Sequence, residues 1–287
     1  MPAITAHAKN PHSRILKRIP STGEPLPVIG MGSSRTFNVG DDTEERAVRV
    51  EVLRTFFAHG GTIIDSSPMY GSSEEVIGHC LAQLEKKDNL FAATKVWTLG
   101  KSRGIRKMQQ SENLWGVDHF DLMQIHNMLD WHKHLATLKD WKEQGKIRYI
   151  GITTSHGRRH EKLIKAIKKE AFDFVQFTYN LHNREAEQYL LPMAKDHDTA
   201  VIINRPFRRG KLFKTVKEKP LPDWAGEIDC ENWAQFFLKF IVSHPDVSCA
   251  IPATSKVAHM KENMGAGFGR LPDAALRQRM IRFYEKL

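Results

Sequence analysis

Four side chains suited to acid–base chemistry follow consecutive apolar runs in the first half of the chain. Asp65 ends the run TIID, Tyr70 lies in the next loop, Lys95 follows LFAAT, and His126 ends DLMQIH. Singly, they are better explained by a helix cap, a packed loop aromatic, a solvated lysine and a buried imidazole. Together they favour chemistry, because an ammonium group beside a phenol lowers the pKa of the phenol and prepares it to transfer a proton.

These residues converge only if the runs before them are neighbouring parallel strands. Helix-length segments separate most of the runs, and strand and helix alternate eight times over 287 residues. This alternation predicts an α/β fold, a (β/α)8 TIM barrel, in which active sites lie at the carboxyl ends of the strands. The runs are PVIG around Val28, TIID to Asp65, LFAAT to Thr94, DLMQIH to His126, IRYIGIT from Ile147, FDFVQF from Phe172, TAVIIN from Thr199 and VSCAIP from Val247.

A doubly wound open sheet is the structural alternative. Its dinucleotide fingerprint G-x-G-x-x-G is missing, because the first run continues as GMGSSR from Gly30. Residues 14–30, with STGE from Ser21 at their centre, predict an N-terminal β-hairpin at the bottom of the barrel. The Lys- and Pro-rich segment 208–230 is expected to be a loop over the active face.

Two helices carry end signals in the sequence. The segment 45–60 closes with the glycine pair Gly60 and Gly61, and the segment 72–87 opens with the capping-box pattern Ser72-x-x-Glu75. Further helices are predicted over 162–172, 185–197, 233–244 and 274–287.

The composition is typical of a soluble globular protein. With 41% hydrophobic and 26% charged residues, we expect a single domain over 1–287, in which 1–14 form a flexible arm. No run approaches the ~18 apolar residues of a membrane span, and the N-terminus lacks the apolar run of a signal peptide. A cytoplasmic protein is expected; a removed leader would leave the same appearance, so a periplasmic or exported origin is the alternative.

The net charge of +10 and the histidines do not define a partner by themselves. Lysine and arginine are dispersed through the helices without a nucleic-acid-binding motif. The pairs His132 and His134, and His156 and His160, lack acidic partners at ligand spacing, and no cysteines form a C-x-x-C pair. We expect no nucleic acid, membrane or metal partner, and a monomer or weak homo-oligomer.

Five motifs, in order along the chain, resemble the aldo-keto reductases. They are GGTIIDSSPMYGSSE over 60–74, TKVW over 94–97, QIHN over 124–127, GKIRYIG over 145–151, and the stretch from Ile251-Pro252 to Asn263. The resemblance extends from the hairpin to the last strand. It implies a metal-free, NADPH-linked reduction of an aldehyde or ketone to an alcohol on a (β/α)8 barrel.

The resemblance assigns a role to each of the four acid–base residues. Tyr70 is the general acid that protonates the carbonyl oxygen as hydride arrives, and Lys95 eases that proton away. Asp65 holds Lys95 charged, and His126 orients and polarises the carbonyl. The physics agrees with this assignment, because a free phenol with a pKa of about 10 is a poor acid near neutrality and a nearby ammonium improves it.

The resemblance also places the cofactor. The nicotinamide end falls on Ser33, Asp65, Thr153, Thr154, Gln176, Asn204, Arg205 and Phe207, and the adenosine end on Thr254, Ser255, Lys256, His259, Glu262 and Asn263. Thr154 replaces the usual Asn, and Asn204 replaces a stacking aromatic, so the ring is either flanked by another contact or held less rigidly. The Arg often seen at His259 is absent. Lys256 at a helix N-terminus favours NADPH over NADH, although a helix cap at Thr254 or Ser255 beside a solvated lysine explains the same residues.

By the same resemblance, the substrate pocket is lined by Ser34, Met69, Trp97, Asn127 and Met128. Ser34 replaces a frequent Trp and the C-terminal tail is short, which predicts an open pocket. Met and Trp are equally common as core residues. The alternative function is a regulatory or redox-sensing barrel that binds the nicotinamide cofactor with little turnover.

Overall fold

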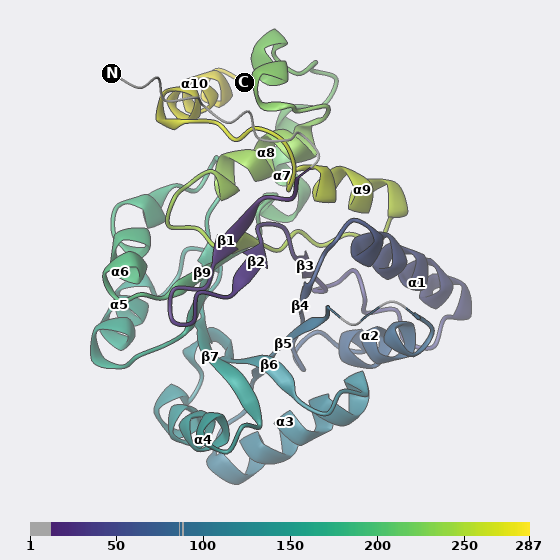
Figure 1. Cartoon of the computed structure of the whole chain (residues 1–287), viewed down its shortest axis with the longest axis vertical. Helices are drawn as coiled ribbons and strands as arrows, with labels where there is room; N and C mark the ends of the chain where they lie inside the picture. Colours follow the sequence, from purple (N-terminus) through teal and green to yellow (C-terminus); the bar gives the residue numbers. More distant parts are fainter. Residues whose placement is uncertain (1–12, 86, 88) are drawn as a thin grey trace, which may run out of the picture.

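Eight parallel strands form one barrel, which confirms the predicted fold (Figure 1). The computed structural model describes residues 13–85, 87 and 89–287. The strands pair in chain order, and a parallel bridge between Ile29 and Ala250 joins the last strand to the first. They are β3 (Met31–Gly32), β4 (Ile63–Asp65), β5 (Phe91–Val96), β6 (Phe120–Ile125), β7 (Ile147–Thr153), β8 (Phe174–Thr178), β9 (Ala200–Asn204) and β10 (Cys249–Ala250).

Alternate side chains of the strands fill the barrel, because successive residues of a strand point to opposite faces. The interior cluster consists of Ile63, Phe91, Ala93, Leu122, Tyr149, Phe174, Ala200, Ile202, Cys249 and Ile251, closed from below by Ile19 and Leu26. The intervening residues pack outward against the helices. The strands are therefore apolar on both faces, which explains why they read as continuous runs.

Helices surround the barrel (Figure 1). They return the chain to the start of the next strand, as parallel pairing requires. Gly60 has φ +75° just after the first helix, which agrees with the predicted glycine ending. The helices are α1 (Thr43–Ala58), α2 (Ser73–Ala82), α3 (Lys101–Trp115), α4 (Trp131–Glu143), α5 (His160–Lys169), α6 (Leu190–Asp196), α7 (Lys211–Thr215), α8 (Trp233–Val242), α9 (Val257–Gly265) and α10 (Ala274–Tyr284).

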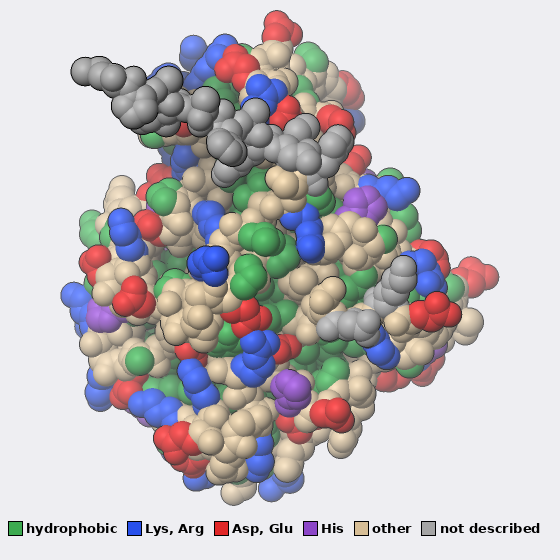
Figure 2. Space-filling view, in the orientation of Figure 1, with side chains coloured by type: hydrophobic (Ala, Val, Ile, Leu, Met, Phe, Trp, Pro, Cys, Tyr) green, Lys and Arg blue, Asp and Glu red, His purple; other side chains and the backbone are tan. Residues whose placement is uncertain are grey.

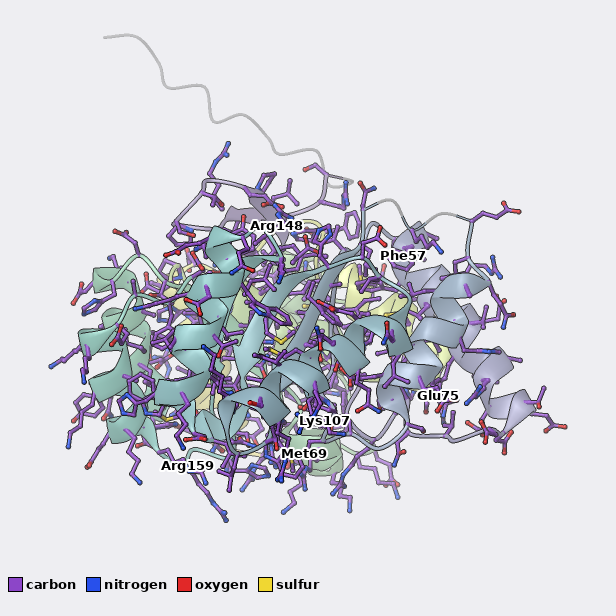
Figure 3. All side chains as sticks on the ribbon, turned by 90° about the horizontal axis from the view of Figure 1, so that it is seen from below. Phe57, Met69, Glu75, Lys107, Arg148 and Arg159 are labelled. Atoms are coloured by element: carbon purple, nitrogen blue, oxygen red, sulfur yellow. The ribbon has the colours of Figure 1, made fainter. Side chains whose placement is uncertain are left out.

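The predicted hairpin closes the amino-terminal end of the barrel. Strands β1 (Leu16–Arg18) and β2 (Pro25–Pro27) pair antiparallel. Lys17 Nζ donates to Val247 O at 2.6 Å just before β10. Residues 1–12 of the expected flexible arm lie outside the described residues, whereas Arg14 is held by a hydrogen bond to Gly60 O at 2.7 Å. Figure 3 places Arg148, beside the hairpin, at the end of the barrel opposite Met69 and Arg159.

The predicted capping box at Ser72 is wrong. Helix α2 begins at Ser73, and the Ser72 side chain caps none of its amides. Instead Ser72 Oγ donates to Asn38 Oδ1 at 3.1 Å and accepts from Gly40 N at 2.8 Å. The hydroxyl is used to hold the loop after β3, and Glu75 pairs with Arg46 of α1.

Two further segments differ from the sequence expectation. The predicted helix over 185–197 is broken into a 3-10 turn, η2 (Glu185–Glu187), and the short α6. Pro192 lies in the first turn of α6, where a missing N–H is tolerated, and would block a helix running through it. The segment 208–230 is not one open loop: it contains η3 (Arg208–Gly210), α7 and η4 (Asp223–Ile228), and only Arg209 and Gly210 of it line the cavity described below.

Candidate functional site

The alternation that fills the barrel also brings polar side chains to its carboxyl end. Each polar residue lies two positions after an inward-facing apolar one, and so points to the same face. The pairs are Ile63 and Asp65, Ala93 and Lys95, Leu122 and Gln124, Phe174 and Gln176, and Ile202 and Asn204. An apolar layer is therefore covered by a polar layer.

Asp65 and Lys95 form the centre of this layer. Their side chains are 3% and 0% exposed, and Lys95 Nζ lies 2.5 Å from Asp65 Oδ2. The other carboxylate oxygen, Oδ1, accepts from Gln124 Nε2 at 2.7 Å and from Gln176 Nε2 at 2.9 Å. Burial disfavours the charge of Lys95, but the Asp65 carboxylate, together with Tyr70 and Glu74, outweighs this cost and raises the pKa of the ammonium. Lys95 therefore stays charged near neutrality.

Tyr70 lies directly beside the ammonium group. Lys95 Nζ is 5.4 Å from the centre of the Tyr70 ring. Nζ also donates to Ser66 O at 2.7 Å, so among the described residues Asp65 and Ser66 engage two of its three protons and leave the third for another acceptor. Burial raises the pKa of the Tyr70 phenol, and the Lys95 charge offsets only part of that rise. The expected net lowering of this pKa is therefore wrong, and the phenol is protonated at neutral pH.

His126 completes the group. Its ring meets the Tyr70 ring edge-on, with the centroids 5.7 Å apart and an interplanar angle of 88°. Nδ1 lies 2.7 Å from Ser67 Oγ. Burial, together with the nearby charge of Lys95, lowers the pKa of His126 to about 2, so the imidazole is uncharged.

A cavity of ≈610 Å³ opens above these residues. This volume is within the range of small-molecule and cofactor sites. Of the residues predicted for catalysis, cofactor or substrate, those that line it are Ser33, Ser34, Asp65, Met69, Tyr70, His126, Asn127, Thr153, Thr154, Gln176, Asn204, Arg205 and Phe207. The strand ends thus bring together most of the predicted site.

The other predicted residues do not line this cavity. Lys95 lies beneath it, in contact with Asp65. Trp97 is 40% exposed, with its ring centroid 6.5 Å from that of His126, and Met128 follows in the 3-10 turn η1 (His126–Met128). The six residues expected at the adenosine end, from Thr254 to Asn263, also lie outside the cavity lining.

The helix expected to begin at Thr254 or Ser255 begins later. Lys256 is the N-terminal cap residue of α9, and no side chain caps this helix. Thr254 Oγ1 accepts from Lys256 N at 3.1 Å, so the hydroxyl holds the preceding turn. Lys256 and His259 are exposed, whereas Asn263 is buried.

Asn204 holds the cavity wall. Its Nδ2 donates to Thr154 O at 2.8 Å, and its Oδ1 accepts from Thr178 Oγ1 at 2.7 Å. Thr153 Oγ1 accepts from Asn127 N at 3.0 Å. In contrast, Thr154 Oγ1 is buried and has no hydrogen-bond partner in the part of the chain that the structure describes. Among these polar groups, Thr154 Oγ1 is the one left for a ligand.

Sequence reasoning missed a group of cationic side chains at the cavity. Arg35 and Arg209 line it together with Arg205, and among the described residues none of the three forms an ion pair. Arg205 Nη1 is buried and has no hydrogen-bond partner within residues 13–85, 87 and 89–287. Burial and the neighbouring arginines lower the pKa of Arg205 to about 10. The signal was present in the sequence as RPFRRG from Arg205, but only the fold adds Arg35.

The hairpin end of the molecule has a different charge distribution. There, Lys and Arg are interspersed with Asp and Glu (Figure 2). No helix among the described residues is long and apolar enough to cross a bilayer. Within the same part of the chain, no three His, Cys, Asp or Glu side chains are grouped to hold a metal ion.

The fold and the site define a (β/α)8 barrel in which a phenol, an uncharged imidazole and a buried ion pair meet at one cavity. The model of the aldo/keto reductase family matches residues 28–278. The chain therefore belongs to this family, which makes it an NAD(P)H-dependent oxidoreductase.

Curated proteins and solved structures are similar to this chain. Methylglyoxal reductase YeaE of Escherichia coli is 27% identical over 243 residues, which cover 83% of this chain and 84% of that protein. A crystal structure of an aldo-keto reductase from Klebsiella pneumoniae with NADPH has a TM-score of 0.78 at 24% identity and covers 95% of each chain. A second Klebsiella pneumoniae structure, with NADP and acetate, has a TM-score of 0.75 at 25% identity, covering 91% of this chain and 93% of that chain.

Proposed function

We propose that this protein reduces an aldehyde or ketone to an alcohol with NADPH, and that Tyr70 is the general acid. The observation that carries the proposal is the buried Lys95–Asp65 ion pair, whose ammonium group lies 5.4 Å from the centre of the Tyr70 ring. Tyr70 and His126 both line the cavity above this pair. Bound NADPH supplies the hydride that the carbonyl carbon receives.

Each of the four residues then has one task. The Tyr70 hydroxyl, protonated at neutral pH, donates its proton to the carbonyl oxygen as negative charge develops there. Lys95 stabilises the phenolate that remains, through the third N–H and its charge. Asp65 keeps Lys95 charged and fixed in position. His126 is uncharged, so it polarises the carbonyl by hydrogen bonding and not by a full charge.

The residues of the cavity fit an anionic dinucleotide. Thr154 Oγ1, which has no partner among the described residues, would hydrogen-bond the nicotinamide carboxamide. The guanidinium groups of Arg35, Arg205 and Arg209 lack carboxylate partners among the described residues, and they would pair with phosphate oxygens. A buried donor without a partner is costly, so a phosphate oxygen at Arg205 Nη1 would be a favourable contact.

The preference for NADPH over NADH rests on exposed positive charge near α9. Lys256 is exposed at the N-terminal end of this helix, where a phosphate dianion is favoured by the backbone amides. Titration of tryptophan fluorescence with each nucleotide tests this preference. Lys256→Gln should weaken NADPH binding and leave NADH binding unchanged; tighter binding of NADH to the unaltered protein would contradict the proposal.

The proposed activity is tested by the oxidation of NADPH with a panel of aldehydes and ketones. Methylglyoxal is the first compound to use, since a relative carries its name. Tyr70→Phe should abolish turnover and leave the Kd for NADPH unchanged. Tyr189→Phe is the matched control, because Tyr189 is 61% exposed and does not line the cavity.

Three outcomes separate the possibilities. Loss of turnover in Tyr70→Phe alone supports the general acid. An unchanged rate in that variant would refute the role of Tyr70. Tight NADPH binding without turnover on any carbonyl would favour a regulatory or redox-sensing protein.

A further inference from the structure

We infer that Ser67 is a positioning residue that fixes the tautomer of His126, so that Nε2–H faces the cavity as a hydrogen-bond donor. The inference rests on the proposed reduction, because that donor would point to the carbonyl oxygen. It adds to the four acid–base residues a serine that does not line the cavity. Ser67 acts only through the imidazole.

The hydrogen bond between Ser67 and His126 Nδ1 is buried. Ser67 is 0% exposed, and its Oγ lies 2.7 Å from His126 Nδ1. The backbone N–H of Met69 donates to the same Oγ at 3.2 Å. Among the described residues, these are the two hydrogen-bond partners of the Ser67 hydroxyl.

Only one arrangement of protons pairs every donor and acceptor around the Ser67 hydroxyl. A hydroxyl has one proton to donate and two lone pairs to accept. Because Met69 N–H takes one lone pair, an Nδ1–H on His126 would take the other and leave the Ser67 proton without an acceptor. A buried, unpaired donor is unfavourable. If Ser67 instead donates to Nδ1, every group is paired and the imidazole proton must lie on Nε2.

The other ring nitrogen is directed to the cavity. His126 lines the cavity, and its Nε2 has no hydrogen-bond partner among the described residues. Although Nε2 has no partner in the described part of the chain, it is not an enclosed atom, so it is accessible from the cavity. Because the imidazole is uncharged near neutral pH, only the tautomer decides whether Nε2 donates or accepts. The wrong tautomer would repel a carbonyl oxygen.

Nitrogen-15 NMR of the full chain, labelled at histidine, tests the inference without requiring turnover. The signals of His126 are assigned by their loss in His126→Gln. We expect the protein at pH 7 to show a protonated Nε2 and an unprotonated Nδ1. A proton on Nδ1 would overturn the inference.

Ser67→Ala should change the tautomer. The variant removes the donor to Nδ1, so we expect a mixture of both tautomers. Ser66→Ala is the matched control: Ser66 is also fully buried, but its Oγ accepts from Ser33 Oγ at 2.8 Å and has no bond to His126, so the tautomer should not change. An Nε2–H tautomer that persists unchanged in Ser67→Ala would also overturn the inference.

Kinetics distinguish this role from a merely structural one. Complete removal of one preorganised donor lowers kcat by ~10²–10³-fold, and the partial loss in Ser67→Ala should lower it by ~10-fold. The Kd for NADPH should stay unchanged. If the unaltered protein shows the expected tautomer and reduces no carbonyl, the proposed function fails while the assignment of the tautomer stands.

Discussion

Replacing Lys95 with methionine should destabilise the protein chiefly through Asp65. The carboxylate would remain enclosed, at 3% exposure, without its ammonium partner. Removal of one member of a buried ion pair costs ~3–5 kcal/mol. Because Gln124 and Gln176 still donate to Oδ1 at 2.7 and 2.9 Å, we expect the lower end of this range, ~3 kcal/mol.

Urea unfolding at pH 7 measures this loss, and a second substitution isolates its cause. In the double variant Asp65→Asn with Lys95→Met, neither member of the pair carries a charge, so the free energy of unfolding should recover by ~1–2 kcal/mol relative to Lys95→Met. Additive destabilisation by the two substitutions would refute the reasoning.

Lys239→Met serves as the control for burial of an ammonium group. Lys239 is 0% exposed and donates to backbone carbonyls, to Ile228 O at 2.6 Å and to Arg270 O at 3.1 Å. Its removal should lower stability but retain the reductase kcat, because it does not line the cavity. Lys95→Met should lower both.

The loss of stability caused by Lys95→Met should change with pH only at high pH, where lysine loses its proton. The pKa of Lys95 is raised by folding, so its contribution is fully present below the unfolded value of about 10.4 and is lost as the pH rises through the folded value. The stability difference between the two proteins should therefore be constant from pH 6 to 9. A difference that disappears within this interval would contradict the charged state assigned to Lys95.

Three further predictions follow from the site and the helix packing. Folding lowers the pKa of His126 to about 2, so stability should be lost as the pH falls below ~6.5, by ~2 kcal/mol at pH 5. His126→Gln should remove this part of the acid dependence in urea unfolding, and an unchanged profile would disprove it. The pKa of the Tyr70 phenol is raised, so the phenol should stay protonated and kcat for reduction should stay constant from pH 6 to 9. A kcat that declines between pH 7 and 8 would show that the phenol loses its proton there. Gly78→Ala should destabilise the fold by ~2 kcal/mol or more, because the added Cβ collides with Leu114 O of α3. A melting temperature within about 1 °C of the parent's corresponds to a change in the free energy of unfolding on the order of a few tenths of a kcal/mol, and would exclude this collision.

The sequence was sufficient to predict the architecture and the polar residues at the carboxyl ends of the strands. Each strand is buried on both faces, so the eight runs could be read directly from their apolar residues. The period of two then places Asp65, Lys95 and Gln176 on the inner face, whatever the details of packing. Helix ends were less predictable. Ser72 has the right residue type for a cap, but its hydroxyl donates instead to Asn38 in a loop distant in sequence.

The sequence alone could not determine the pKa values and side-chain contacts that depend on residues from different parts of the barrel. The direction of the Tyr70 pKa depends on how far burial outweighs Lys95, and this balance exists only in the assembled cavity. The bond between Ser67 and His126 joins residues 59 positions apart, and the arginines gather from loops after the first and seventh barrel strands. Local pattern fixes which face a side chain occupies, whereas desolvation and through-space charge arise from neighbours that only the closed barrel brings together.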